Sequence, residues 1–154
     1  MIEVGIGQLI GGYAQGLPAI KTQQLQAVNA LIGTRFYPVV LPENPTWPCA
    51  SYQLISDTPG YTLSGPSGLD VKRIQIDAWS GGPTNASFLV AKQIALAIRL
   101  LLAGSKSTPY FAGKLPDGSR VAAILVAGSH DSFEQDARAY RTTTDFMVTY
   151  YPQT

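Results

Sequence analysis

Two segments of the chain alternate strictly between residues of different polarity, and this pattern constrains the fold more than any other feature. In residues 72–79, Ile74, Ile76 and Ala78 share one side, and the residues between them are polar or, at Trp79, amphipathic. Residues 140–151 repeat the alternation, with Phe146 and Val148 on one side. A period of two is that of a β-strand with one buried face. Both segments are therefore predicted to be half-buried strands.

Two other segments have the period of an α-helix. Residues 19–32 place apolar side chains on one stripe, and Gly33 is positioned to end the helix. A second helix is predicted up to Ala103, capped at its start by Thr84 or Asn85, with an apolar face wide enough to lie across a sheet. The glycine-rich residues 2–13 are predicted to form either a marginal helix or an adaptable arm, because each glycine weakens a helix by about 1 kcal/mol.

The remaining segments complete an α+β pattern. Residues 50–56 alternate like a half-buried strand, and residues 36–41 form an extended segment that Pro38 and Pro42 confine to a sheet edge. The continuous apolar run 121–127 predicts a central strand buried on both sides. The simplest arrangement is a single antiparallel β-sheet covered on one face by helices. We expect one domain over 1–154, with an N-terminal helix or arm (1–18) and an α+β core (19–151).

Residues 57–70 predict a long loop or hairpin that leaves the sheet. Pro59-Gly60, Gly65-Pro66 and Gly68 are strong turn signals, and Tyr61 and Leu63 have no evident core to enter. The loop 105–113 carries Tyr110 and Phe111 in a similar setting. Trp79 either covers the edge of the core or anchors a contact with another subunit. The expected subunit or partner interface therefore comprises Tyr61, Leu63, Pro66, Trp79, Tyr110 and Phe111.

Composition narrows the class of partner. Charged residues make up 14% of the 154 residues and hydrophobic residues 45%, a low charged fraction for a soluble domain. Either other subunits bury part of this surface, or its exterior is rich in uncharged polar residues. The net charge of +1 gives no basic footprint for ordinary nucleic-acid binding. The apolar tract 94–103 is interrupted by Arg99 and is too short to span a bilayer, so no membrane partner is expected.

The sequence contains no convincing catalytic, cofactor or metal site, and we expect no enzymatic activity. Ser129, His130 and Asp131 are adjacent, so on an extended chain they point to alternating faces and cannot align as a triad. Gly5, Gly7 and Gly11 resemble a dinucleotide loop but have no room for a preceding strand. The single Cys49 is predicted to be a small core residue.

Three acids close together in the sequence, Asp131, Glu134 and Asp136, leave two interpretations open. They belong to a solvated acidic loop, or they line a channel in which repeated copies around a ring create an acidic wall. The second interpretation predicts that they face the lumen of an assembly.

An ordered set of short motifs resembles a known family, the tail completion proteins of long-tailed phages. These proteins are also called tail terminators or tail-to-head joining proteins, and they occur in gene transfer agents as well. The resemblance covers roughly residues 25–151. It rests on Gly33-Thr34-Arg35-Phe36-Tyr37-Pro38, Leu41-Pro42, Trp47-Pro48, Tyr52-Gln53, Gly65-Pro66-Ser67-Gly68, Gln75-Ile76-Asp77-Ala78-Trp79, Tyr140-Arg141, Asp145-Phe146 and Tyr150.

The resemblance implies a structural virion protein that forms a ring, expected to be hexameric, at the head-proximal end of a phage tail. Such a ring terminates the tail tube and joins it to the head connector, and DNA passes through its centre without sequence-specific binding. The implied partners are further copies of this chain, the tail tube protein and connector or adaptor proteins. The implied location is the virion neck, after assembly in the host cytoplasm. The alternative is a non-viral, monomeric protein-binding module with a similar α+β fold.

Overall fold

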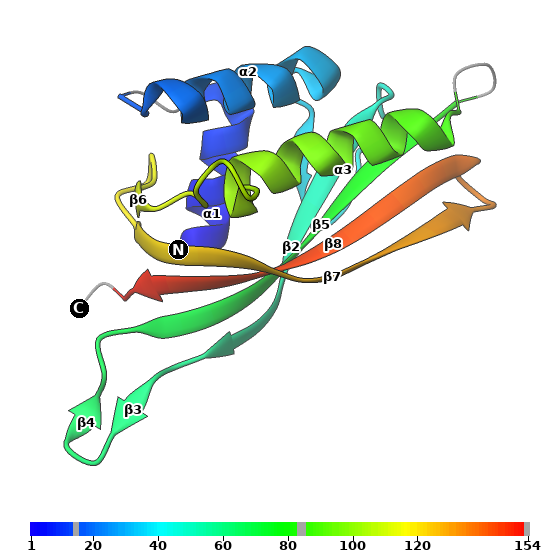
Figure 1. Cartoon of the computed structure of the whole chain (residues 1–154). Helices are drawn as coiled ribbons and strands as arrows, with labels where there is room; N and C mark the ends of the chain where they lie inside the picture. Colours follow the sequence, from blue (N-terminus) through cyan, green and yellow to red (C-terminus); the bar gives the residue numbers. More distant parts are fainter. Residues whose placement is uncertain (14–15, 83–85, 153–154) are drawn as a thin grey trace.

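A curled sheet with helices on one side organises the protein (Figure 1). The computed structural model describes residues 1–13, 16–82 and 86–152. The six-stranded sheet has the order β1-β2-β5-β8-β7-β6. Its strands are β1 (Phe36–Pro38), β2 (Cys49–Thr58), β5 (Asp70–Gly81), β6 (Gly113–Lys114), β7 (Arg120–Glu134) and β8 (Ala139–Tyr151). The helical segments are α1 (Ile2–Gln8), the π-helical η1 (Leu9–Tyr13), α2 (Ala19–Ile32) and α3 (Phe88–Ala103).

The predicted α+β class is confirmed, with a sheet that is antiparallel except at one edge. β2, β5, β8 and β7 pair antiparallel in turn, whereas β1 runs parallel to β2. The predicted strands 72–79 and 140–151 form the centre of the sheet as β5 and β8. The predicted edge segment is shorter than expected and ends at Pro38. A second small sheet, β3 (Tyr61–Thr62) with β4 (Gly65–Pro66), forms the expected hairpin excursion.

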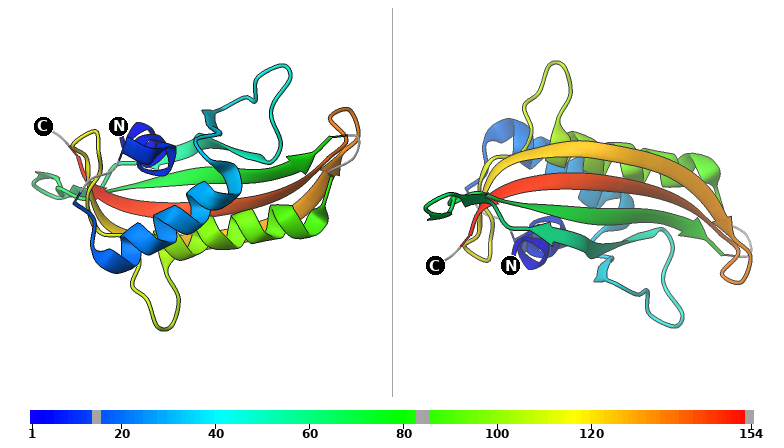
Figure 2. Two further views of the ribbon diagram at one scale, coloured as in Figure 1. Left: turned by 90° about the horizontal axis from the view of Figure 1, so that it is seen from above. Right: turned by 90° about the horizontal axis from the view of Figure 1, so that it is seen from below.

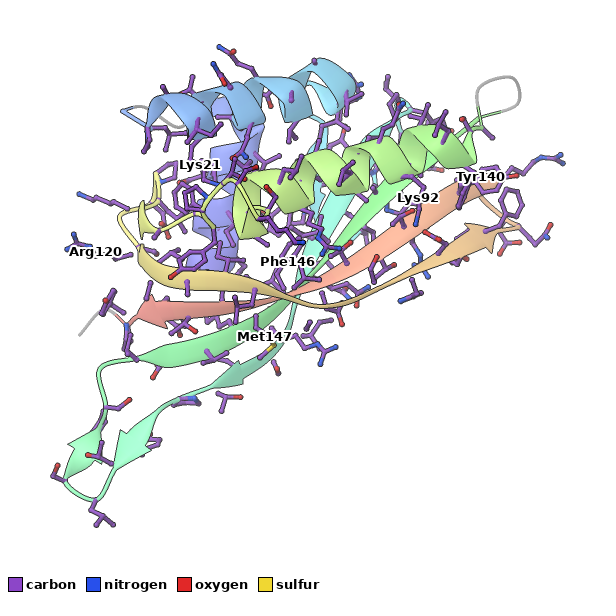
Figure 3. The ribbon with its side chains drawn as sticks, viewed as in Figure 1. Lys21, Lys92, Arg120, Tyr140, Phe146 and Met147 are labelled. Atoms are coloured by element: carbon purple, nitrogen blue, oxygen red, sulfur yellow. The ribbon has the colours of Figure 1, made fainter. Side chains whose placement is uncertain are left out.

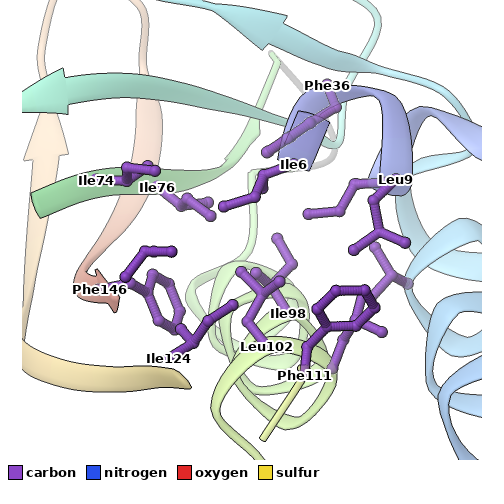
Figure 4. Close-up of a cluster of buried hydrophobic side chains, with 14 of the residues drawn as sticks. Ile6, Leu9, Phe36, Ile74, Ile76, Ile98, Leu102, Phe111, Ile124 and Phe146 are labelled. Carbon is purple, nitrogen blue, oxygen red and sulfur yellow. The ribbon is translucent and has the colours of Figure 1, made fainter. Parts of the chain in front are cut away.

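All the helices lie on one face of the sheet. Ile94, Ile98 and Leu101 of α3 are buried and contribute to one cluster with the apolar side of β5 and β8 (Figure 4). The view from below in Figure 2 shows the other face of β5, β8 and β7 without any helix over it. α3 begins later than predicted, since Ser87 caps it by accepting a hydrogen bond from the Val90 amide at 3.3 Å. Thr84 and Asn85, the predicted caps, lie outside the described residues.

The N-terminal segment is a helix rather than an arm. Ile2, Ile6, Leu9 and Ile10 are fully buried in the main hydrophobic cluster. Two of its glycines allow close packing: a Cβ at Gly5 would collide with the side chains of Leu115 and Asp117, and one at Gly7 with the ring of Tyr52. Gly5 and Gly7 weaken this helix locally but allow its close packing against Leu115, Asp117 and Tyr52.

The interpretation of residues 121–127 as a central strand buried on both sides is wrong. They belong to β7, whose outer side is paired only with β6 at residues 113–114. Because helices cover one face only, alternate residues of the apolar run face solvent, and Leu125 is 58% exposed. The strand also continues further than expected, to Glu134.

A buried lysine joins two helices. Lys21 of α2, labelled in Figure 3, is 3% exposed. Its Nζ donates to the carbonyl oxygens of Leu101 at 2.9 Å and Pro109 at 2.7 Å. Carbonyls at the end of a helix have no partner within the helix, so Lys21 satisfies the end of α3 and fixes the loop that follows. Burial lowers the pKa of Lys21.

A second ionic contact holds α1 to the sheet. Lys72 of β5 donates to Glu3 at 3.0 Å, and its ammonium lies 5.4 Å from the centroid of the Tyr150 ring. Burial on its own raises the pKa of Glu3, but hydrogen bonds from its own backbone and from Lys72, with the Lys72 charge, lower the pKa overall. The ionised carboxylate is therefore the form that the folded state favours.

An acidic residue at Ile76 should prevent folding. Ile76 is 3% exposed within the hydrophobic cluster, and an unpaired carboxylate there has no compensating partner. We expect Ile76→Asp to abolish the cooperative urea transition followed by circular dichroism. The matched change Leu63→Asp, at a fully exposed side chain, should leave that transition in place; unfolding of both variants, or of neither, would contradict this assignment of the core.

Acid should weaken the attachment of α1. The Glu3 pKa in the folded state lies below its ordinary value of 4.5, so its contribution is complete above that value and is lost as pH falls through the folded pKa. Thermal unfolding of the wild type and of Glu3→Gln, measured from pH 7 to pH 3, should show a Tm difference that shrinks on acidification. A difference that is constant with pH would show that ionised Glu3 contributes nothing specific.

Candidate interaction surfaces

The first candidate surface is the tip of the hairpin between β2 and β5. Tyr61 is 72% exposed and Leu63 is fully exposed, and Pro66 is exposed beside them. Figure 1 shows this hairpin projecting from the body, beyond the end of the sheet. Among the described residues, these side chains lie outside the hydrophobic cluster and leave most of their surface open.

Local hydrogen bonds hold the hairpin in a defined shape. The amide of Gly60 donates to the Asp70 carboxylate at 2.9 Å, and the amide of Ser67 donates to the Gly60 carbonyl at 2.8 Å. Glycine is required at position 60, because a Cβ there would collide with the Leu69 carbonyl oxygen. The tip is therefore presented by an ordered support.

The bare face of the sheet is the second candidate surface, and it carries a polar network. Asp77 of β5 is 8% exposed and accepts a hydrogen bond from Thr143 of β8 and a longer one, 3.4 Å, from Gln75. Nearby, Arg73 donates to Asp145 at 2.6 Å. Figure 3 shows Met147 on this side, away from Phe146, which faces α3. The face combines fixed polar groups with a few apolar side chains.

Trp79 sits at the centre of a cross-strand arrangement on this face. Its indole Nε1 donates to Ser51 of β2 at 3.1 Å, and the guanidinium of Arg141 lies 5.1 Å from its ring. Arg141 also pairs with Glu134 of β7 at 3.0 Å. The half-buried indole is thus held in place across four strands, with part of its surface left open.

A groove of about 400 Å³ runs beside Trp79. Its walls are the segment after β1 and the β7–β8 turn, and its lining includes Val39, Val40, Trp79, Glu134, Asp136 and Arg141. Val40 is 71% exposed. Val39 has a φ of 62°, an unusual conformation for a β-branched residue. The groove has the size of a ligand site, but its polar floor and open shape suit a protein loop.

The three predicted lumen-facing acids do not lie on one face. Asp131 accepts hydrogen bonds from Lys92 of α3 at 3.0 Å and from Thr142 at 2.9 Å, on the helix side. The Lys92 hydrogen bond is the main reason that the pKa of Asp131 is lowered. Glu134 and Asp136 instead line the groove on the bare face. The three acids therefore do not form a single wall within the subunit.

The two predicted contact residues in the loop after α3 have different environments. Tyr110 is 41% exposed, beside a second groove that Leu17 and Pro109 also line. The expectation that Phe111 has no place in the core is wrong. Phe111 is 3% exposed in the hydrophobic cluster, and its amide donates to the Leu102 carbonyl at 2.8 Å. Its side chain is not available to a partner, because Lys21 and this amide turn the loop back onto α3.

The candidate catalytic residues lie in a β-strand, and the single cysteine lies in the core. Ser129, His130 and Asp131 occupy consecutive positions of β7, so their side chains alternate between its two faces. Burial raises the pKa of Cys49 to about 12, which keeps it a protonated core thiol at neutral pH. In the described ranges 1–13, 16–82 and 86–152, no three His, Cys, Asp or Glu residues are grouped to hold a metal ion.

The α+β subunit thus has three candidate contact surfaces: an ordered hairpin, a polar sheet face and a groove between loops. Within the part of the chain that the structure describes, no helix is both long and apolar enough to cross a membrane. Exposed apolar side chains gathered in this way mark sites of contact with other molecules.

Comparisons with known proteins identify the family. The profile of the family "Tail completion protein gp17" matches residues 22–151. Since this match spans most of the chain, the protein belongs to the tail completion protein gp17 family and is a structural component of a tail. No curated protein matches it by sequence. A solved structure described as the virion of a native gene transfer agent particle has a similar fold, with a TM-score of 0.55 and 21% identity over 87% of this chain and 93% of that one.

The hairpin tip and the loop after α3 should respond differently to truncation. Tyr61→Ala with Leu63→Ala should change the free energy of unfolding by about 0.5 kcal/mol or less, because neither side chain packs in the subunit. Phe111→Ala should cost about 3–5 kcal/mol, because it leaves a cavity in the core. Urea unfolding of the two variants beside the wild type tests both assignments; a large loss in the hairpin variant would show that its tip is part of the core.

Proposed function

We propose that this chain forms a ring, most simply of six copies, at the head-proximal end of a phage-type tail. The ring terminates the tail tube and joins it to the head connector. The observation that carries the proposal is the tail completion family match over residues 22–151. The similar fold in a gene transfer agent virion supports it at the level of architecture.

The surfaces of the subunit suit this role. A closed ring uses head-to-tail contacts, in which one surface of a subunit meets a different surface of the next. The hairpin tip with Tyr61 and Leu63 lies at one end of the sheet, and the groove beside Trp79 lies toward the other end. A subunit with two unlike surfaces can contact a neighbour copy and the tail tube protein or a connector protein at the same time.

DNA would pass through such a ring without being recognised by sequence. The net charge of +1 gives no strong attraction for phosphates. Repetition around the ring would bring copies of Glu134 and Asp136 into proximity if the groove end of the sheet faces the lumen. Asp131 and Glu134 would contribute less than Asp136, since Lys92 and Arg141 form ion pairs with them within the subunit. In this proposal the protein assembles in the host cytoplasm and resides in the virion neck.

Capping of tail tubes tests the proposal. Purified protein mixed with uncapped tubes should appear as a ring at one tube end in negative-stain images and should sediment with the tubes. Tyr61→Ala with Leu63→Ala should lower the capped fraction about tenfold or more, because one buried apolar side chain is worth about 1.5 kcal/mol or more. Ser64→Ala, at the same tip, is the matched control and should cap normally.

The contradicting result is a protein that stays monomeric and leaves the tubes uncapped under every condition. That outcome would favour the alternative of a monomeric protein-binding module. If the hairpin variant and Ser64→Ala cap tubes equally well, the proposed ring stands, but the hairpin tip is not part of its contacts.

A further inference from the structure

The sheet has two long edges that no strand of the subunit covers. β1 pairs with β2 only at residues 50–52, and β6 pairs with β7 only at residues 113–114. Among the described residues, no strand therefore lies beside the outer side of β2 from Gln53 to Thr58 or of β7 from Ala122 to Glu134. Figure 2 shows β2 and β7 on opposite sides of the sheet. Such edges carry unpaired backbone donors and acceptors that can template another strand.

The two edges lack proline and basic residues, although each contains β-bulges, at Ile55 in β2 and at Ala122 and Ala127 in β7. Edge strands are normally blunted with proline or with lysine and other charges. Residues 53–58 and 122–134 contain no proline, lysine or arginine, and their charged residues are Asp57, Asp131 and Glu134. The exposed side chains at the two edges include Leu54, Ile55 and Leu125, at 40%, 44% and 58% exposure. Unpaired edges that also carry exposed apolar side chains are candidates for pairing with another strand.

We infer that the free edge of β2 in one copy of this chain pairs with the free edge of β7 in the next copy. The inference rests on the proposed ring and specifies its contact. β2 runs antiparallel to β5, β5 to β8 and β8 to β7, so β2 and β7 run in opposite directions. A rotation about an axis along the strands brings β2 of one copy antiparallel to β7 of the next, which continues the pattern of the sheet across the interface.

Side chains on the helix side of the two edges are complementary. Beside β7, a shallow groove of about 250 Å³ is lined by Lys92, Leu96 and Arg99 of α3 and by Ser129. Leu96 is 57% exposed, and Arg99 forms no ion pair with any of the described residues. On the β2 edge, Leu54 lies opposite Ile74, on the helix side, and Asp57 is exposed. In a sheet that continues across the interface, the helix sides of the two copies lie on the same face. Leu54 of one copy would then contact Leu96 of the next, and Asp57 would approach the basic side chains that line the groove.

Cysteine crosslinking tests this pairing. Ser56 lies opposite Arg73 and Leu125 opposite Met147, so both belong to the bare face. Directly opposed residues in an antiparallel pair have Cβ atoms about 5 Å apart and diagonal ones about 7–8 Å apart. A bis-maleimide that spans about 8 Å therefore reaches neighbouring registers as well. Cys49 is fully buried, so it does not compete for the reagent in the folded protein.

We expect Ser56→Cys with Leu125→Cys to give a ladder of covalent oligomers that ends at the ring. Each single variant can give dimers at most, since one cysteine cannot link a chain on both sides. Ser56→Cys with Ser107→Cys, in the exposed loop after α3, is the matched control and should also stop at dimers. Circular dichroism of each variant confirms that it is folded before the reagent is added.

A ring seen by sedimentation without a ladder overturns the edge pairing and leaves the proposed function standing. A protein that gives neither a ring nor a ladder, with or without tail tubes, overturns both. A ladder from a protein that fails to cap tubes supports the edge pairing and overturns the proposed function. Crosslinks from Leu125→Cys to the tail tube protein alone would assign the β7 edge to a different partner and overturn the inference.

Discussion

The pairing of β5 with β8 is the interaction on which the other elements depend. It runs without a bulge from Asp70 opposite Tyr150 to Gly81 opposite Ala139. These two strands present Ile74, Ile76, Phe146 and Val148 to the helices, where all four are buried. They also carry the polar network of Asp77 and Thr143 on the other face. The hairpin extends beyond one end of the β2–β5 pair, so its position is also set by these strands.

Because the helices lie on one side of the sheet, the subunit leaves the other face and the edges of the sheet available for contacts. α1, α2 and α3 all cover one face of the sheet (Figure 1), and the opposite face keeps partly exposed groups such as Trp79, Arg141 and Met147. β1 and β6 are too short to protect the edges of β2 and β7. A sheet covered on one face has its buried core on the helix side, and burial of its other face and edges would require other chains.

Much of this architecture could be predicted from periodicity. The alternation in residues 72–79 and 140–151 identifies β5 and β8, because one face of each strand is covered and the other is not. The run 121–127 was wrongly predicted to be buried on both sides because helices cover only one face of β7, so apolar residues on its other face, such as Leu125, stay exposed. Phe111 was wrongly expected to lie outside the core. The buried Lys21 holds the loop against α3, and no local sequence pattern indicates this role of the lysine. The Trp79–Arg141–Glu134 arrangement depends on register between strands far apart in sequence, which the alternation within each strand does not fix.

The location of this chain in an assembled particle tests the central claim most directly. An electron cryomicroscopy map of the neck should show this fold repeated as a closed ring between the last ring of the tail tube and the head connector. In that map the helix-covered faces of neighbouring copies should be continuous across paired sheet edges, and each hairpin tip should contact another chain. A neck with no ring of this fold, or a ring in which the hairpin tips and the sheet edges all face solvent, would contradict the account.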